Sequence, residues 1–268
     1  MNGFAVPRGI ARGFLAALLL GAVVVQPAAA APRVRDFARL DAQVSKLQAV
    51  GASQKAIDAV FAANGLVRVD SGAGSDVVPL SASTSNDVTL GQPAIYLDER
   101  FDYFVATATF QWKHNCNDLL RYKNQCVAKE CLIVTGDCGG QDGFGIRLTR
   151  AVNEVKTSFY THNTDGYQMP TWTNPEQLND WGASWTEQDS LDNGRYNWDG
   201  GNVYFMFHLK SCARGDTYKA YSRLDHTWSN TTLTGFGIGK DNFSVSWTSE
   251  AARWTATNAV TTYWYPCG

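Results

Sequence analysis

Aromatic side chains gather among amides and carboxylates in the segment 170–202. Flat rings beside such polar groups suit the faces and hydroxyls of sugars. We take five of these aromatic residues as ligand-binding candidates: Trp172, Trp181, Trp185, Tyr196 and Trp198. Long loops on a rigid scaffold often carry function. The alternative is that the rings form the small core of the loop itself.

The same segment carries side-chain oxygens that could bind calcium. They belong to Asp189, Asp192, Asn193, Asp199 and Asn202. Ca²⁺ takes about six to eight oxygen ligands, and the spacing here differs from that of an EF-hand loop. We therefore expect no cofactor, with structural calcium as the weaker alternative.

Hydrolysis of a glycan would need two carboxylates about 5–10 Å apart across a groove. The available acids include Asp98, Glu154, Glu187 and Asp189. Glu187 and Asp189 have the spacing that shares one face of a strand, but we expect their segment to be a loop. Solvated loop acids are the simpler interpretation, so no catalytic residue is predicted.

The four histidines give no clearer indication of catalysis. His114, His162, His208 and His226 all lie among β segments. We interpret them as surface or partly buried strand residues rather than as general bases.

The string Gly136-Asp-Cys-Gly-Gly140 resembles the nucleophile segment of chymotrypsin-like cysteine proteases. The resemblance implies a Cys138 thiolate beside an oxyanion hole of backbone N–H groups. In that family the histidine and the acid lie far upstream on a separate barrel, whereas here the one upstream histidine is His114, shortly before Cys138. We therefore interpret the string as a glycine-rich turn that carries a disulfide-bonded cysteine.

The first 30 residues have the layout of a secretory signal peptide. Arg8 and Arg12 precede the apolar run 14–25, and Ala28-Ala29-Ala30 supplies the small residues of a cleavage site. The apolar run is too short for the ~20 residues that span a bilayer, so a retained anchor is the less favoured alternative. We expect a secreted, extracellular protein that begins near Ala31 and has no membrane span after cleavage.

All six cysteines follow the cleavage site: Cys116, Cys126, Cys131, Cys138, Cys212 and Cys267. An even number in an exported chain favours disulfides. We expect Cys212 to pair with Cys267, which would stabilise the fold by about 4 kcal/mol in the chain-entropy model. The other four would cross-link the segment between strands 102–112 and 144–149. Their spacing does not match zinc knuckles.

The charge balance argues against nucleic acid as a partner. The whole chain has 23 basic and 25 acidic residues. Loss of Arg8 and Arg12 with the signal leaves 21 basic residues and a formal net charge of −4. Nothing in this balance attracts a polyanion to the chain as a whole.

The N-terminal part of the mature chain predicts a helical hairpin. Phe37, Leu40, Val44 and Leu47 recur at helical spacing and stop at Gly51. Ser53 is the expected N-cap of a second helix that ends at Asn64-Gly65. The hairpin is too short to be stable alone, so it either docks on the main domain or is a removable pro-segment. Residues 71–92 are small and polar and predict a flexible linker, with an ordered surface loop as the alternative.

From about residue 96 the period changes to two, which is typical of antiparallel strands. In 102–112 the even positions from Phe104 to Trp112 form an apolar face, whereas Thr107, Thr109 and Gln111 form a more polar one. The other expected strands are 144–149, 155–161, 203–209, 217–223, 243–248 and 253–257. Gly235-Phe-Gly-Ile-Gly239 lies among them, and we interpret its glycines as sites of kinks or of close strand packing.

These patterns predict a mainly β fold. We expect an antiparallel, jelly-roll-like β-sandwich preceded by a short helical hairpin, with a closed barrel as the alternative. The expected divisions are a signal peptide at 1–30, the hairpin at 31–70, the linker at 71–92 and a disulfide-bonded sandwich at 93–268.

Three functions remain open from the sequence. The first is non-catalytic binding of an extracellular ligand such as a glycan or cell-wall material. The second is a secreted glycan hydrolase that uses a carboxylate pair, and the third is a structural extracellular protein without a small ligand.

Overall fold

The computed structural model describes residues 35–69, 88–112, 120–122, 125–127, 136–163, 165–169, 174–192, 195–211, 217–227, 231–249 and 253–259. All of them belong to one compact unit, Val34–Gly268. The expected signal peptide and residues 71–87 of the expected linker lie outside the described residues. No helix in the described part of the chain is long and apolar enough to cross a membrane.

The predicted helical hairpin is confirmed. Helix α1 spans Ala38–Ala49 and α2 spans Gln54–Ala63. The Ser53 side chain accepts a hydrogen bond from the backbone N–H of Ala56 and so caps α2. Gly65 ends the hairpin with a φ of 79°, a conformation that glycine adopts without steric cost.

The first sheet has six antiparallel strands. In spatial order they are β1 (Leu66–Arg68), β3 (Ala94–Asp98), β4 (Tyr103–Trp112), β12 (Gly200–Leu209) and β8 (Val152–His162), with β2 (Val88–Leu90) also on β4. Strands β1 and β2 precede residue 93 and yet pair with β3 and β4. The expected domain divisions stay predictions.

The second sheet is also antiparallel and six-stranded. Its order is β11 (Arg195–Tyr196), β10 (Gly182–Asp192), β7 (Gly136–Leu148), β13 (Ala220–Thr227) and β16 (Arg253–Ala259), with β9 (Gln177–Asn179) also on β10. Two separate hairpins complete the described strands: β14 (Leu233–Ile238) with β15 (Phe243–Trp247), and β5 (Leu120–Tyr122) with β6 (Gln125–Val127). Neither sheet closes on itself within the described strands.

The two sheets share one hydrophobic core. The even positions of β4 that the sequence marked as apolar contribute to it, and Phe110 lies 4.9 Å from Phe144 of the second sheet between ring centroids. Phe159 of β8 lies 5.3 Å from the ring of Trp185 and the same distance from that of Trp198. Aromatic pairs across this core therefore hold the two sheets together.

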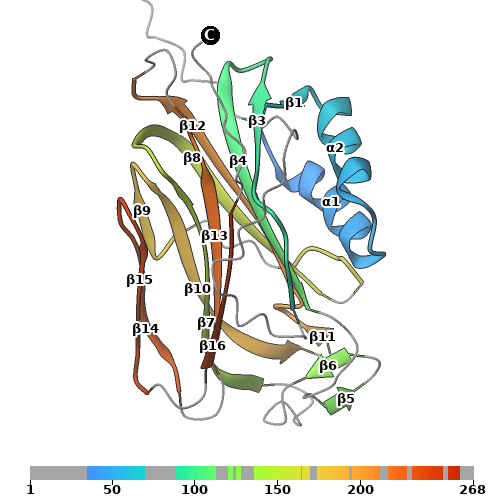
Figure 1. Cartoon of the computed structure of the whole chain (residues 1–268). Coiled ribbons are helices and arrows are strands. Elements are labelled where there is room, and N and C mark those ends of the chain that lie inside the picture. The colour runs from blue at the N-terminus through green and yellow to red at the C-terminus, as the bar shows by residue number, and fades with distance from the viewer. Residues whose placement is uncertain are drawn as a thin grey trace, which may run out of the picture. The chain divides into compact units, whose positions relative to one another are not determined.

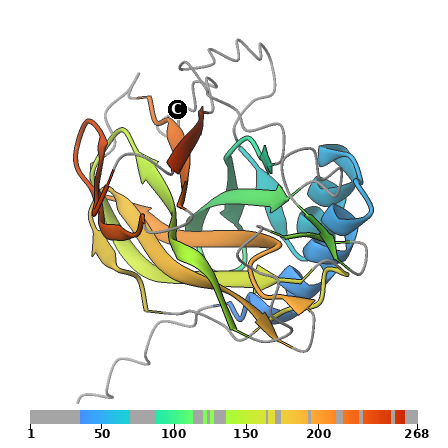
Figure 2. The same cartoon turned by 90° about the horizontal axis from the view of Figure 1, so that it is seen from below.

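The helical pair covers the other face of the first sheet. Phe37 stacks on Tyr204 at 4.5 Å, and Phe61 stacks on Tyr96 at 4.3 Å. Both views show α1 and α2 on the side of β3 and β4 that is remote from the second sheet (Figures 1 and 2). The hairpin thus buries its narrow apolar face by docking, as its short length requires.

The β14–β15 hairpin covers the outer face of the second sheet. It lies at the opposite side of the unit from the helices (Figures 1 and 2). A Cβ atom added to Gly145 of β7 would lie 3.0 Å from Cε1 of Phe236 and 3.2 Å from Cε1 of Phe243. The absence of a side chain at Gly145 lets the hairpin approach the sheet this closely.

The prediction that 170–202 lacks a clear strand is wrong. The segment contains β9, β10 and β11. Ala183, Ser184 and Trp185 are all buried because β10 has the core on one face and β14 on the other. A strand covered on both faces loses the alternation by which half-buried strands are recognised.

Candidate functional site

The structure separates the five predicted ligand-binding aromatics. Trp185 and Trp198 are 2% and 0% exposed and belong to the core between the sheets. Trp181 is only partly buried. Trp172 lies outside the described residues, and of Tyr196 only the backbone, in β11, is described. Among the members of this set whose side chains are described, Trp181 is the one that is accessible to a ligand.

Trp181 lines an open pocket of about 590 Å³, which we call the Trp181 pocket. Three turns or strand ends meet there: the β7–β8 turn, the end of β12 and the β14–β15 turn. Its lining residues are Thr149, Arg150, Ala151, Trp181, Lys210, Ser211 and Lys240. The volume lies in the range of about 300–1,000 Å³ that is usual for small-ligand sites.

Hydrogen bonds hold the backbone beneath this pocket. The Trp181 carbonyl accepts from the backbone N–H of Leu148 at 2.7 Å, and the Asp180 carbonyl accepts from that of Val152 at 2.8 Å. The Trp181 N–H donates to the Asn179 side chain at 2.8 Å. The β7–β8 turn and the start of β10 are thus joined, which fixes the direction from which the indole projects.

Charged side chains line the same pocket as Trp181. The Arg150 Nε donates to the Thr217 carbonyl at 3.1 Å, and its guanidinium lies 5.9 Å from the centre of the Tyr218 ring. Lys210 forms an ion pair with Asp180. The pocket therefore combines an aromatic face with positioned cationic donors.

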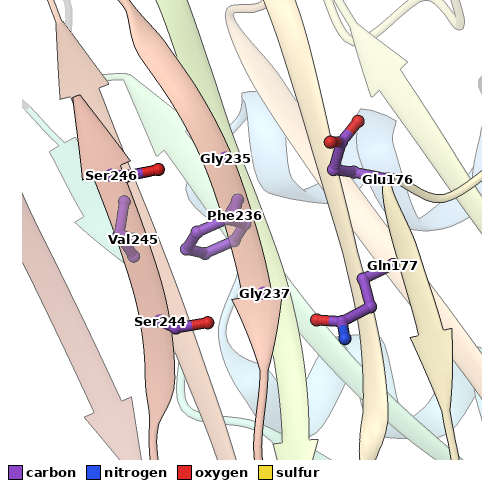
Figure 3. A pocket seen from close by; sticks show the side chains of 8 residues that line it. All are labelled: Glu176, Gln177, Gly235, Phe236, Gly237, Ser244, Val245 and Ser246. Carbon is purple, nitrogen blue, oxygen red and sulfur yellow. The ribbon is translucent and has the colours of Figure 1, made fainter. Parts of the chain in front are cut away.

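A second hollow lies on the β14–β15 hairpin, and Figure 3 shows its lining. Gly235 and Gly237 form its floor, with Ser244 and Ser246 on β15 and Glu176 and Gln177 on the other side. We call it the Gly235 groove, and its volume is about 480 Å³. The ring of Phe236 is 1% exposed, so the groove offers no aromatic face to a sugar.

The glycines of this groove have the close packing that the sequence predicts. A Cβ atom on Gly235 would lie 3.0 Å from Oγ of Ser246, and one on Gly237 would lie 2.4 Å from Oγ of Ser244. A side chain at Gly237 would displace the Ser244 hydroxyl, and one at Gly235 would pack tightly against that of Ser246.

The acids named as hydrolase candidates are dispersed over the fold. Asp98 is fully buried and forms an ion pair with Arg35 at 2.6 Å. Glu154 lies on β8, where partial burial raises the pKa of its carboxyl group. Glu187 and Asp189 lie on β10 and not on a loop, with a register shift between Gln188 and Ser190. The Asp189 side chain lies outside the described residues.

One cross-strand pair of acids escaped the sequence analysis. Glu187 of β10 is in register with Asp142 of β7, so the two side chains leave the same face of the second sheet. Burial raises the pKa of Glu187 to about 7. Asp142 is fully buried, contacts Nδ1 of His226 at 2.7 Å, and accepts from the backbone N–H of Thr227 at 2.8 Å. Sequence periodicity could not pair two residues that lie 45 positions apart.

A second buried aspartate joins α1 to the first sheet. Both carboxylate oxygens of Asp41 are engaged, and the residue is 0% exposed. Its four partners, at 2.8–2.9 Å, are His162, Gln168, Asn202 and Tyr204. The sequence contains a sign of this network, because Asp41 follows Phe37 by four residues and so lies on the apolar face of the helix.

Of the five proposed calcium ligands, the structure describes the side chains of Asp199 and Asn202, and each is engaged with another side chain. Gln111 donates to the side chain of Asp199 at 2.9 Å, and Asn202 donates to Asp41 at 2.8 Å. The side chains of Asp189, Asp192 and Asn193 lie outside the described residues. Among the residues that the structure describes, no group of three or more histidine, cysteine, aspartate or glutamate side chains could hold a metal ion.

The six cysteine side chains also lie outside the described residues. The backbones of Cys126 and Cys138 fall in β6 and β7. The expected disulfides, including the bond between Cys212 and Cys267, stay predictions.

Comparison with known proteins adds no assignment to this geometry. The chain matches no family model, and no curated protein matches it.

Proposed function

We propose that the chain is a secreted, disulfide-bonded protein with a jelly-roll-like β-sandwich that binds an extracellular glycan or cell-wall material without catalysis. The observation that carries the proposal is the Trp181 pocket, where a partly exposed indole stands among hydrogen-bond donors. Sugar rings pack their C–H faces on such indoles, while side chains at the rim bind hydroxyls. The held backbone at 180–181 supports the proposal, because less backbone entropy is lost when a ligand binds.

A glycan array with the secreted protein tests this function. We expect binding to a subset of glycans, and we expect Trp181→Ala to weaken it at least ~10-fold, as for aromatic residues at the centre of interfaces. Tyr167→Ala is the matched control, because Tyr167 is an exposed aromatic residue outside the pocket. No binding across a broad panel, or equal losses in the two variants, would contradict the proposal.

The Glu187–Asp142 pair supports a second candidate, a glycan hydrolase. A carboxyl group with a pKa of about 7 is suited to act as a general acid near neutral pH. Against this role, Asp142 is fully buried and already has His226 and Thr227 as partners.

A reducing-sugar assay on every bound glycan separates the two candidates. Binding without release of reducing ends is the expected result. Release that Glu187→Gln abolishes, while binding persists, would favour the hydrolase.

A further inference from the structure

We propose that the ligand of the Trp181 pocket is an anionic glycan, in which carboxylate, sulfate or phosphate groups are carried on the sugar rings. This inference rests on the proposed function and names the substrate class of the same pocket. Its basis is the charge of the rim, which is opposite in sign to that of the mature chain.

The lining of the pocket contains three cations, Arg150, Lys210 and Lys240, and no carboxylate. A fourth cation lies behind it, because the Arg147 guanidinium donates to the Lys240 carbonyl at 2.8 Å. The carboxylates on the described parts of the same turns are Asp180 and Asp241. Asp180 forms an ion pair with Lys210.

The charge of the pocket lining thus differs in sign from the net charge of the chain. The whole chain carries 23 basic and 25 acidic residues, with a formal net charge of −2. A patch with a positive excess on a chain of net negative charge attracts anions locally, while the rest of the surface repels polyanions. This combination favours a ligand with separated charges over a dense polyanion such as nucleic acid.

Two of the cations are oriented by contacts within the fold. Arg150 is held by the Thr217 carbonyl and by the Tyr218 ring, which leaves less side-chain entropy to be lost when a ligand binds. Lys210 is held by Asp180, the residue that precedes the indole. A guanidinium group can bind a carboxylate or a sulfate through two parallel hydrogen bonds.

The indole decides between an anionic sugar and a simple anion. A small inorganic anion would use the cations alone and would gain nothing from Trp181. An anionic sugar uses both, because its ring packs on the indole and its acidic group faces the cations. The volume of about 590 Å³ is also larger than a single small anion needs.

The test measures binding of a ligand pair that differs only in charge. Oligogalacturonate and its methyl ester share one backbone, and titration calorimetry of both with the secreted chain separates charge recognition from ring recognition. Dextran sulfate with dextran, and a phosphate-bearing glycan with its dephosphorylated form, test the two other sources of charge.

The variants Lys240→Gln and Arg150→Gln remove charge from the rim. Lys240 is exposed, so we expect Lys240→Gln to leave the fold intact. Arg150→Gln removes the hydrogen bond to the Thr217 carbonyl and could lower stability, so Lys240→Gln keeps the test independent of folding. Lys55→Gln is the matched control, because Lys55 is an exposed lysine on α2. We expect each rim variant to weaken binding of the preferred anionic glycan about 5–10-fold and to leave binding of its neutral partner unchanged.

The outcomes distinguish this inference from the proposed function. Equal affinity for the charged and neutral members of every pair, with loss only in Trp181→Ala, would overturn the anionic class and keep glycan binding. No binding of any glycan would overturn both. Binding of single-stranded DNA as tight as that of the best anionic glycan would overturn selectivity for sugars.

Discussion

Single buried charges account for much of the specificity with which this fold is assembled. Asp41 connects α1 to β8 and β12 through three hydrogen bonds, and a fourth joins it to Gln168 beyond the end of β8. Burial and the neighbouring Asp41 carboxylate both raise the pKa of Tyr204 well above its usual value. The Tyr204 hydroxyl therefore keeps its proton at neutral pH and donates a hydrogen bond to Asp41.

Replacement of Asp41 should be costly. Asp41→Asn puts an NH₂ group where two of the four donors now meet a carboxylate oxygen, so buried donors lose their acceptor. We expect the free energy of unfolding to fall by about 3 kcal/mol. Urea denaturation measures it, with Asp36→Asn as the control, because Asp36 is exposed at the start of the same helix. Equal effects of the two substitutions would contradict a stabilising role for the network.

Stability should decrease as the pH rises from about 5 towards 7 and then level off. Burial raises the pKa of Asp199 from 3.8 to about 7 and that of Glu187 from 4.5 to about 7. Between the unfolded and the folded pKa of each group, the folded chain keeps a proton that the unfolded chain has lost. The stabilisation from each group is therefore fully present below its unfolded pKa and declines as the pH rises towards its folded pKa. That stabilisation is lost as the pH approaches 7, at about 1.4 kcal/mol per pH unit for each group.

Denaturant unfolding at pH 5, 6, 7 and 8 measures this slope. Asp199→Asn should reduce it, because the amide cannot ionise and its oxygen still accepts from Gln111. Glu99→Gln is the control, because Glu99 is exposed and should leave the slope unchanged. A stability that does not fall between pH 5 and pH 7 would contradict raised pKa values for these two carboxyl groups.

At the scale of the element, the residue just before β10 and the residues within it lie in different environments. Trp181 precedes the strand and lines a pocket, whereas Trp185, four residues later, is in the core. Both residues had the same sequence signal, a tryptophan among polar residues. Sequence alone could not separate them, because the separation depends on which face β7 and β14 leave open.

Truncation of the two tryptophans should reveal this difference. Trp185→Ala leaves a cavity beside Phe159 and should cost about 3–5 kcal/mol. Trp181→Ala should cost less than about 1 kcal/mol while it weakens glycan binding at least ~10-fold. Thermal or urea unfolding of both variants makes the comparison. A large loss of stability in Trp181→Ala would assign that indole to the core and not to a binding pocket.

Other elements were predicted because each had a strong local pattern. The helices have an apolar period of 3.6 with capping residues, and β4, β8 and β12 overlap the predicted ranges. The pattern failed where both faces of a strand are buried, as in β10. It also did not show that the odd positions of β4, such as Val105, would face the helical pair rather than water.

At the scale of the whole molecule, the fold is layered from the helical pair through the two sheets to the β14–β15 hairpin (Figure 2). Each layer covers an apolar face of the next, so the helices are part of the folded unit Val34–Gly268. This arrangement opposes removal of the hairpin as a pro-segment, because its loss would expose Tyr96 and Tyr204.

The export prediction has a direct test. We expect the protein recovered from the culture medium to begin near Ala31 and to have a mass six hydrogens below that of the reduced chain, equivalent to three disulfides. Iodoacetamide should label no cysteine before reduction, and non-reducing peptide mapping should recover a Cys212–Cys267 peptide. Labelling of Cys138 in the native protein would instead support the cysteine nucleophile that its sequence resembles.

The sequence by itself determined the mainly β class, the helical pair and the aromatic character of the segment 170–202, because these depend on local periodicity and composition. Only the tertiary structure decided that Trp181 is accessible while Trp185 and Trp198 are buried. It also brought Arg150, Lys210 and Lys240 from three distant turns to the rim of one pocket. Such convergence depends on strand order and register between residues far apart in the chain, and no local pattern encodes these.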